Sequence, residues 1–201
     1  MLLHAEDLAH GRFETATQQH TGPIELKIGI DTGVTLCRLA AANPETLFVG
    51  VEIKRPNAER AYRRAVESSL ANVWVVNDEA SNFIRKHCLS SSFSATHIYF
   101  PTPFPGALRK IGVNSSDRLI TARFMDDAHR VLGISCSLRI ITDVSEYFRM
   151  VESFAVLDKW LHVEWRELKL PIPKGCLVGT PTEVKYRRES REIYSMQLLK
   201  I

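Results

Sequence analysis

Short apolar runs alternate along the chain with longer stretches in which apolar residues recur every three or four positions. The short runs are rich in β-branched residues and end at turn formers, which is typical of buried strands; they cover residues 24–30, 47–52, 73–76, 96–100 and 137–142. The longer stretches have the period of amphipathic helices and cover residues 34–42, 56–70, 81–87, 121–131 and 145–157. Strands that alternate with helices predict a parallel sheet with right-handed crossovers.

The end of the chain departs from this alternation. Two further strands, at 161–168 and 193–200, follow without an intervening helix and predict a terminal antiparallel pair. The segment between them is expected to be a long loop, because it holds Pro171, Pro173, Gly175, Gly179 and Pro181. The pattern therefore predicts a single α/β domain over residues 1–201, with a doubly wound, seven-stranded sheet.

Composition adds little beyond the class of protein. The chain has 45% hydrophobic and 24% charged residues, as ordinary globular proteins do. No apolar stretch approaches the roughly 18 residues of a membrane span, the first residues lack a secretory pattern, and the four cysteines form no CxxC pair. We expect a cytoplasmic protein with no membrane association and no metal.

The net charge of +3 is unevenly distributed. Residues 159–201 hold nine basic and five acidic side chains, whereas residues 1–158 hold 17 and 18. A second basic cluster consists of Lys54, Arg55, Arg60, Arg63 and Arg64. Such clusters either bind nucleic-acid phosphates or form solvated helix faces, and the pattern leaves both interpretations open.

A glycine-rich turn follows the first strand. It reads Gly29-Ile-Asp31-Thr-Gly33, and the second strand ends at Glu52, 19 residues after Gly33. Glycines allow a sharp turn and close approach of a ligand, and an acid at the end of the second strand typically accepts hydrogen bonds from ribose hydroxyls. These features predict a nucleoside-containing cofactor, either NAD or S-adenosylmethionine. The absence of a full GxGxxG pattern favours S-adenosylmethionine.

Later segments extend this pattern in a fixed order. The chain reads FVGVEIKRPNAERA at 48–61, NVWVVNDEA at 72–80, IYFPTPFP at 98–105, TDVSEY at 142–147 and PTEVK at 181–185. These segments resemble the TrmB family of tRNA (guanine-N7)-methyltransferases, whose members show EIGxGxG, GxE before a basic helix, an acid-Ala pair, FPDPW, TDxxxY and TEYE. The resemblance covers roughly residues 20–200. It implies the Rossmann-like fold of class I S-adenosylmethionine-dependent methyltransferases, with S-adenosylmethionine as cofactor.

The resemblance also implies which residues form the cofactor site. These residues share the carboxyl ends of the first four strands and are Gly29, Asp31, Gly33, Glu52, Ile53, Asp78, Glu79, Ala80 and Phe100. Glu52 would bind the ribose, and Glu79 with Ala80 would lie beside the adenine. A plainer interpretation of Glu79 is an acid at a helix N-terminus, where the helix dipole favours it.

A second set of residues would contact the substrate, again by resemblance. It consists of Pro103, Phe104, Asp143, Thr182, Glu183 and Lys185. Phe104 would stack on a base or on the cofactor, or else pack on the core. Asp143 would accept from the amino edge of a purine, or else cap the helix that begins near Ser145. Thr182 and Glu183 would face the pocket.

Four positions depart from the family pattern. Lys27 replaces the acid before Ile-Gly, Asp31 the middle glycine, Thr102 the aspartate of FPDPW, and Lys185 the last acid of TEYE. Lys27 and Thr102 are the positions expected at the catalytic centre. Guanine N7 carries an unprotonated lone pair at neutral pH, so its attack needs no general base. Replacing the aspartate with Thr102 therefore removes only a carboxylate that would offset positive charge on the ring. Glu25 shares a strand face with Lys27 and would compensate the positive charge of its side chain. The alternative is that the Lys27 side chain points to solvent.

These departures leave three functions open. The first is methyl transfer to tRNA, the substrate that the resemblance implies. The second is methyl transfer to a small, purine-like N-heterocycle. Lys27 or Lys185 would favour the loss of a proton from such a substrate. The third is a catalytically silent binding module of the same fold, because fold alone does not imply activity.

Overall fold

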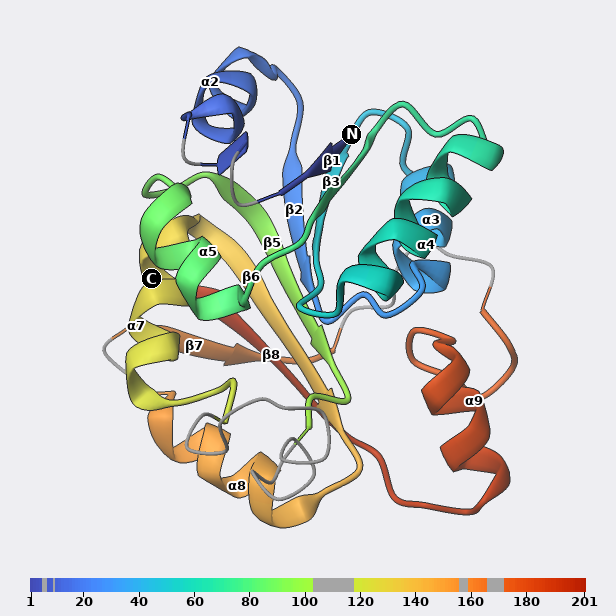
Figure 1. The fold of residues 1–201 in the computed structure, drawn as a ribbon. Helices are drawn as coiled ribbons and strands as arrows, with labels where there is room; N and C mark the ends of the chain where they lie inside the picture. The colour runs from blue at the N-terminus through green and yellow to red at the C-terminus, as the bar shows by residue number, and fades with distance from the viewer. Residues whose placement is uncertain (5–6, 9, 103–117, 156–158, 166–171) are drawn as a thin grey trace.

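The computed structural model describes residues 1–4, 7–8, 10–102, 118–155, 159–165 and 172–201. Among them, eight strands form one sheet with helices on both faces (Figure 1). The strands are β1 (Leu2–Leu3), β2 (Ile24–Ile28), β3 (Leu47–Val51), β4 (Val73–Val76), β5 (Phe93–Tyr99), β6 (Leu132–Thr142), β7 (Trp160–Val163) and β8 (Tyr194–Lys200). The helices are α2 (Arg12–Gln19), α3 (Val34–Ala42), α4 (Arg55–Glu67), α5 (Ala80–His87), α7 (Ala122–Val131), α8 (Ser145–Phe154) and α9 (Pro181–Arg188).

The sheet has the order β1-β4-β3-β2-β5-β6-β8-β7. Strands β1 to β6 are parallel, and β8 runs antiparallel between β6 and β7. The predicted doubly wound sheet with a terminal antiparallel pair is therefore confirmed, with one additional edge strand, β1. The strand order reverses between β2 and β5, and a ligand crevice forms at such a switch point, beyond the carboxyl ends of the strands.

Two hydrophobic layers enclose the sheet, because side chains alternate between the faces of each strand. Leu26 and Ile28 of β2 pack in one layer with Phe83 of α5 and Phe124 of α7. The opposite face packs against α3 and α4, and this second layer includes Phe48, Val73, Val75, Leu36 and Ala61. Figure 1 shows α5, α7 and α8 on one side of the sheet and α3 and α4 on the other.

The C-terminal segment differs from its prediction. The expected loop before β8 contains helix α9, which Pro181 opens as an N-terminal proline can. The Thr180 hydroxyl caps α9 by accepting a hydrogen bond from Glu183 N at 2.9 Å. Strand β7 covers Trp160–Val163, and residues 166–168 of the predicted strand lie outside the described residues.

Two elements near the N-terminus, β1 and α2, were not predicted from the sequence pattern. In the described part of the chain, no helix combines the length and the apolar character that crossing a membrane requires. The cytoplasmic location stays a prediction.

Candidate functional site

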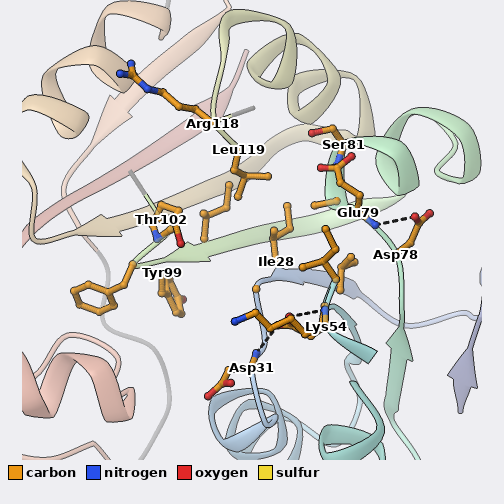
Figure 2. Close-up of a pocket in the computed structure, with 18 of the residues that line it drawn as sticks. Ile28, Asp31, Lys54, Asp78, Glu79, Ser81, Tyr99, Thr102, Arg118 and Leu119 are labelled. Atoms are coloured by element: carbon orange, nitrogen blue, oxygen red, sulfur yellow. Dashed lines mark hydrogen bonds between the residues drawn. The ribbon is translucent and has the colours of Figure 1, made fainter. Parts of the chain in front are cut away.

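A cavity of about 620 Å³ lies at the carboxyl ends of β2, β3, β4 and β5, where the strand order reverses (Figure 2). Its size suits a small-molecule ligand. It brings together nine of the residues singled out in the sequence, which are Gly29, Asp31, Glu52, Ile53, Asp78, Glu79, Ala80, Phe100 and Thr102. No group of three metal-ligating side chains occurs among the described residues.

Glu52 joins two of the turns that border the cavity. Its Oε2 accepts a hydrogen bond from Asp31 N at 2.9 Å, and its Oε1 accepts one from Lys54 N at 3.0 Å. Burial raises the pKa of this carboxyl, and the two backbone donors act in the opposite direction. Each carboxylate oxygen has a second lone pair, so the group retains the capacity to accept from ligand hydroxyls.

The turn after β2 requires left-handed backbone at three positions. Gly29 has φ 68°, Asp31 φ 49° and Gly33 φ 79°. A Cβ on Gly33 would lie 2.7 Å from Cβ of Ala61, so glycine permits the close approach of α3 and α4. Asp31 occupies a conformation that aspartate tolerates, and its Oδ1 accepts a hydrogen bond from Asn57 Nδ2 at 2.9 Å. The turn therefore accommodates Asp31 in place of the family's middle glycine.

Two acids follow β4 and organise the start of α5. Glu79 is the N-cap, and its carboxylate accepts from Ser81 N at 2.9 Å and from Asn82 N at 2.7 Å. Asp78 accepts from Asn82 Nδ2 at 2.8 Å. The interpretation of Glu79 as an acid at a helix N-terminus is thus confirmed. Because both side chains also line the cavity, capping does not exclude contact with a ligand.

Lys27 does not point to solvent, so that alternative was wrong. The side chain is only 2% exposed, and its Nζ lies 4.1 Å from the ring centroid of Tyr99. It is also absent from the described lining of the cavity. Burial lowers the pKa of this lysine to about 7, so a large share of the amine is neutral at neutral pH.

Beside Lys27, a buried network that was not predicted joins β2 to β5. His97 Nε2 lies 2.8 Å from Glu25 Oε2, and His97 Nδ1 lies 2.7 Å from the Tyr99 hydroxyl. Burial lowers the pKa of His97 more than its contact with Glu25 raises it. The neutral tautomer that satisfies both contacts donates from Nε2 to Glu25 and accepts from Tyr99. Glu25 is therefore engaged by His97 instead of compensating Lys27.

The predicted helix-capping role of Asp143 was wrong. The N-cap of α8 is Val144, which makes no side-chain cap, and Val144 N donates to the Thr142 hydroxyl at 3.2 Å. Asp143 Oδ2 instead accepts from Arg191 Nη1 at 2.9 Å. This partner precedes β8, 48 residues away in sequence, so local capping rules could not reveal it.

Helix α9 carries three of the residues expected to contact a substrate. Glu183 is fully buried, and its carboxylate accepts from the backbone N–H groups of Leu177, Val178 and Gly179. The Lys185 side chain is 67% exposed. Thr182, Glu183, Lys185 and Asp143 are not among the described residues that line the cavity, contrary to expectation. Pro103 and Phe104 lie outside the described residues.

Several basic side chains of the C-terminal segment bind partners within the fold. Arg187 Nε donates to Glu183 at 3.0 Å, Arg191 binds Asp143, and the buried Lys200 donates to Leu132 O at 2.8 Å. Three arginines also line the cavity, at positions 85, 118 and 123. They come from separate segments that the packing of α5 against α7 brings together.

Comparisons with known proteins agree with this geometry. The model of the family described as "Putative methyltransferase" matches residues 21–196. The chain is 29% identical over 187 residues to the tRNA (guanine-N(7)-)-methyltransferase of Rubrobacter xylanophilus, covering 89% of this chain and 77% of that one. It is 26% identical over 183 residues to the enzyme of the same name from Wolinella succinogenes, covering 90% of this chain but only 43% of that longer protein.

A solved structure supports the fold assignment. The geranyl diphosphate C-methyltransferase of Streptomyces coelicolor, in complex with Mg²⁺, geranyl diphosphate and S-adenosyl-L-homocysteine, superposes with a TM-score of 0.58 at 12% identity. The match covers 96% of this chain and 80% of that one. At this identity the likeness concerns the fold, which is the class I methyltransferase fold predicted from the sequence.

Proposed function

We propose that this chain, which belongs to the methyltransferase family matched over its residues 21–196, transfers the methyl group of S-adenosylmethionine to N7 of a guanine in tRNA. The observation that carries the proposal is the cavity at the switch point of the sheet. The acids that follow β2, β3 and β4 line this cavity together with Thr102, which follows β5. The names of the two relatives supply the substrate class.

The residues of the cavity fit S-adenosylmethionine. The cavity volume of about 620 Å³ lies within the usual range for cofactor sites. Nothing lies within 4 Å of a Cβ built on Gly29, so the backbone there is open to close approach of a ligand. Ile53 is 45% exposed and offers an apolar surface beside Glu52, as an adenosine requires. Glu52 would hold the ribose, with Asp78 and Glu79 toward the adenine.

The chemistry requires little of the protein beyond positioning. The cofactor supplies a methyl group on a positively charged sulfur, and guanine N7 supplies a free lone pair. No residue therefore has to remove a proton before transfer, and orientation of the two reactants contributes most of the acceleration. Thr102 lines the cavity without a charge.

The alternative of a small N-heterocycle has lost its physical argument. It required Lys27 or Lys185 beside the reacting atoms, where an ammonium would stabilise an anionic nucleophile. Lys27 is buried against Tyr99, and Lys185 is exposed on α9. Among the described residues neither one lines the cavity, so no observation favours this substrate over tRNA.

A transfer assay tests the proposal. The purified chain is incubated with S-adenosylmethionine that carries a labelled methyl group and with unfractionated tRNA, and the digested nucleosides are identified by mass spectrometry. We expect label in N7-methylguanosine. Label in any other nucleoside, or none while the cofactor binds, would contradict the proposed acceptor.

The role proposed for Glu52 predicts a loss of cofactor affinity. Glu52→Ala should raise the dissociation constant of S-adenosylmethionine about 5- to 150-fold, as expected for 1–3 kcal/mol of lost hydrogen bonding to a charged group. Isothermal titration measures this constant, and thermal unfolding checks that the turns at Asp31 and Lys54 persist. Glu59→Ala, on α4 and away from the described cavity lining, is the matched control and should bind normally. Equal affinity in both variants would refute the ribose assignment.

Thr102 gives a prediction about the rate. Thr102→Asp places a carboxylate at the end of β5, where it would offset positive charge that develops on the guanine ring. We expect methyl transfer to tRNA to accelerate about tenfold, a moderate value because Thr102 is solvent-exposed. Single-turnover kinetics measure the effect. Thr102→Asn has nearly the same shape without the charge, so equal rates in the two variants would contradict the electrostatic explanation.

A further inference from the structure

Three arginines line the cavity and form what we name the arginine rim, consisting of Arg85, Arg118 and Arg123. Arg85 comes from α5, Arg118 precedes α7, and Arg123 lies in the first turn of α7. Figure 2 shows Arg118 and Leu119 on the side of the cavity opposite Asp31, with the Arg118 side chain directed outward. The described lining is therefore uneven in charge, with four acids and one cation, Lys54, at the strand ends and three cations at the rim.

The rim carries more positive than negative charge. Arg123 is exposed and makes no hydrogen bond or ion pair with any described residue. Arg118 Nη1 donates at 2.9 Å to Sδ of Met150, which is a neutral acceptor. Arg85 has a carboxylate partner, Asp127, but at 3.4 Å and with 41% of its side chain exposed. Such exposed pairs are weak, so the three guanidinium groups remain available to an anion.

The backbone that carries the rim is held firmly. Ile120 is fully buried and its N–H donates to the Tyr147 hydroxyl at 3.3 Å. Thr121 caps α7, its hydroxyl accepting from Phe124 N at 3.1 Å. Arg118 and Arg123 thus flank a fixed helix start, whose dipole adds positive potential to that of the side chains. The backbone positions of these two arginines are therefore set before an anion binds, which lowers part of the entropic cost of binding.

We infer that the arginine rim binds the phosphate backbone of the RNA substrate next to the guanine that enters the cavity. This inference rests on the proposed function and deepens it. A guanine that reaches the end of β5 brings its flanking phosphates to the mouth of the cavity. Guanidinium groups bind phosphate oxygens through paired N–H donors, and such contacts fix the position of a nucleic acid without reading its sequence. The acids at the strand ends repel phosphates, so the RNA backbone stays at the rim while the base enters.

A variant without Arg118 and Arg123 tests the inference. Arg118→Ala combined with Arg123→Ala should raise the dissociation constant of fluorescently labelled, unfractionated tRNA about tenfold or more at low salt. The slope of log affinity against log salt should become shallower by about one to two, because fewer counterions are released. The affinity for S-adenosylmethionine should stay unchanged in isothermal titration. Arg118→Lys with Arg123→Lys keeps the charges and should retain most of the salt dependence.

The controls separate this inference from its alternatives. Arg63→Ala removes an exposed arginine on α4, on the opposite face of the sheet, and should weaken tRNA binding less than Arg123→Ala does. Equal losses would mean that only overall charge matters, and would overturn the rim. Loss of cofactor affinity in the double variant would instead assign the rim to the cofactor carboxylate. Unchanged tRNA affinity in that variant would refute this inference alone, whereas a wild type that binds cofactor but no tRNA would refute the proposed substrate.

Discussion

Replacing Lys27 with methionine should raise the free energy of unfolding by about 2–4 kcal/mol at pH 7. The pKa of the buried amine is about 7, below the usual 10.5 of lysine, because burial disfavours its charge. Between these two pH values the unfolded chain binds more protons than the folded one, so stability rises with pH. The benefit of methionine should therefore shrink as the pH rises from 7 toward 10.5 and level off below 7.

Urea denaturation at pH 7 and pH 9.5 measures this effect. Lys86→Met removes an exposed lysine from α5 and serves as the control, with little change expected at either pH. Some of the gain at Lys27 will be offset by the lost contact between its ammonium and the Tyr99 ring. A gain that is the same at both pH values would mean that packing of methionine, and not removal of a buried charge, explains it.

Replacing Glu183 with alanine should lower the free energy of unfolding by about 3–5 kcal/mol. Its buried carboxylate accepts from three backbone N–H groups at 2.6–2.9 Å and from Arg187 at 3.0 Å. Alanine would leave these donors without a partner, which costs more than the hydrogen bonds themselves contribute. The loop at 177–179 would also loosen, and with it the contact of Gly179 O with Arg38 Nη1 at 2.6 Å.

Denaturant unfolding of Glu183→Ala and of Glu189→Ala provides the comparison. Glu189 lies on the same helix but is exposed, so its loss should change stability by less than about 1 kcal/mol. Glu183→Gln, which keeps one oxygen acceptor, should fall between the two. If Glu183→Ala were no less stable than Glu189→Ala, the carboxylate would not organise this loop. Methyl transfer need not change in parallel, because Glu183 is absent from the described cavity lining.

Residues that the sequence places just after a strand line the cavity as expected, and their roles stay predictions. Glu52 directly follows β3, Asp78 lies two residues after β4 and Thr102 three residues after β5, and the carboxyl ends of parallel strands meet at one edge. Prediction failed for Asp143 and Glu183, whose side chains turn toward partners within the C-terminal part of the fold. A motif fixes the backbone position of such residues, but the direction of the side chain depends on which groups lie beside it.

The sequence by itself determined the alternation of strands and helices, the turn at Gly29–Gly33 and the family of the chain. These features depend on local periodicity, on backbone freedom at glycine and on the order of short segments. The tertiary structure alone decided that Lys27 is buried against Tyr99 and that Arg85 and Arg118 meet at one cavity. The physical reason is that burial and charge are properties of the space around a side chain. Here that space is built by strands and helices far apart in the chain.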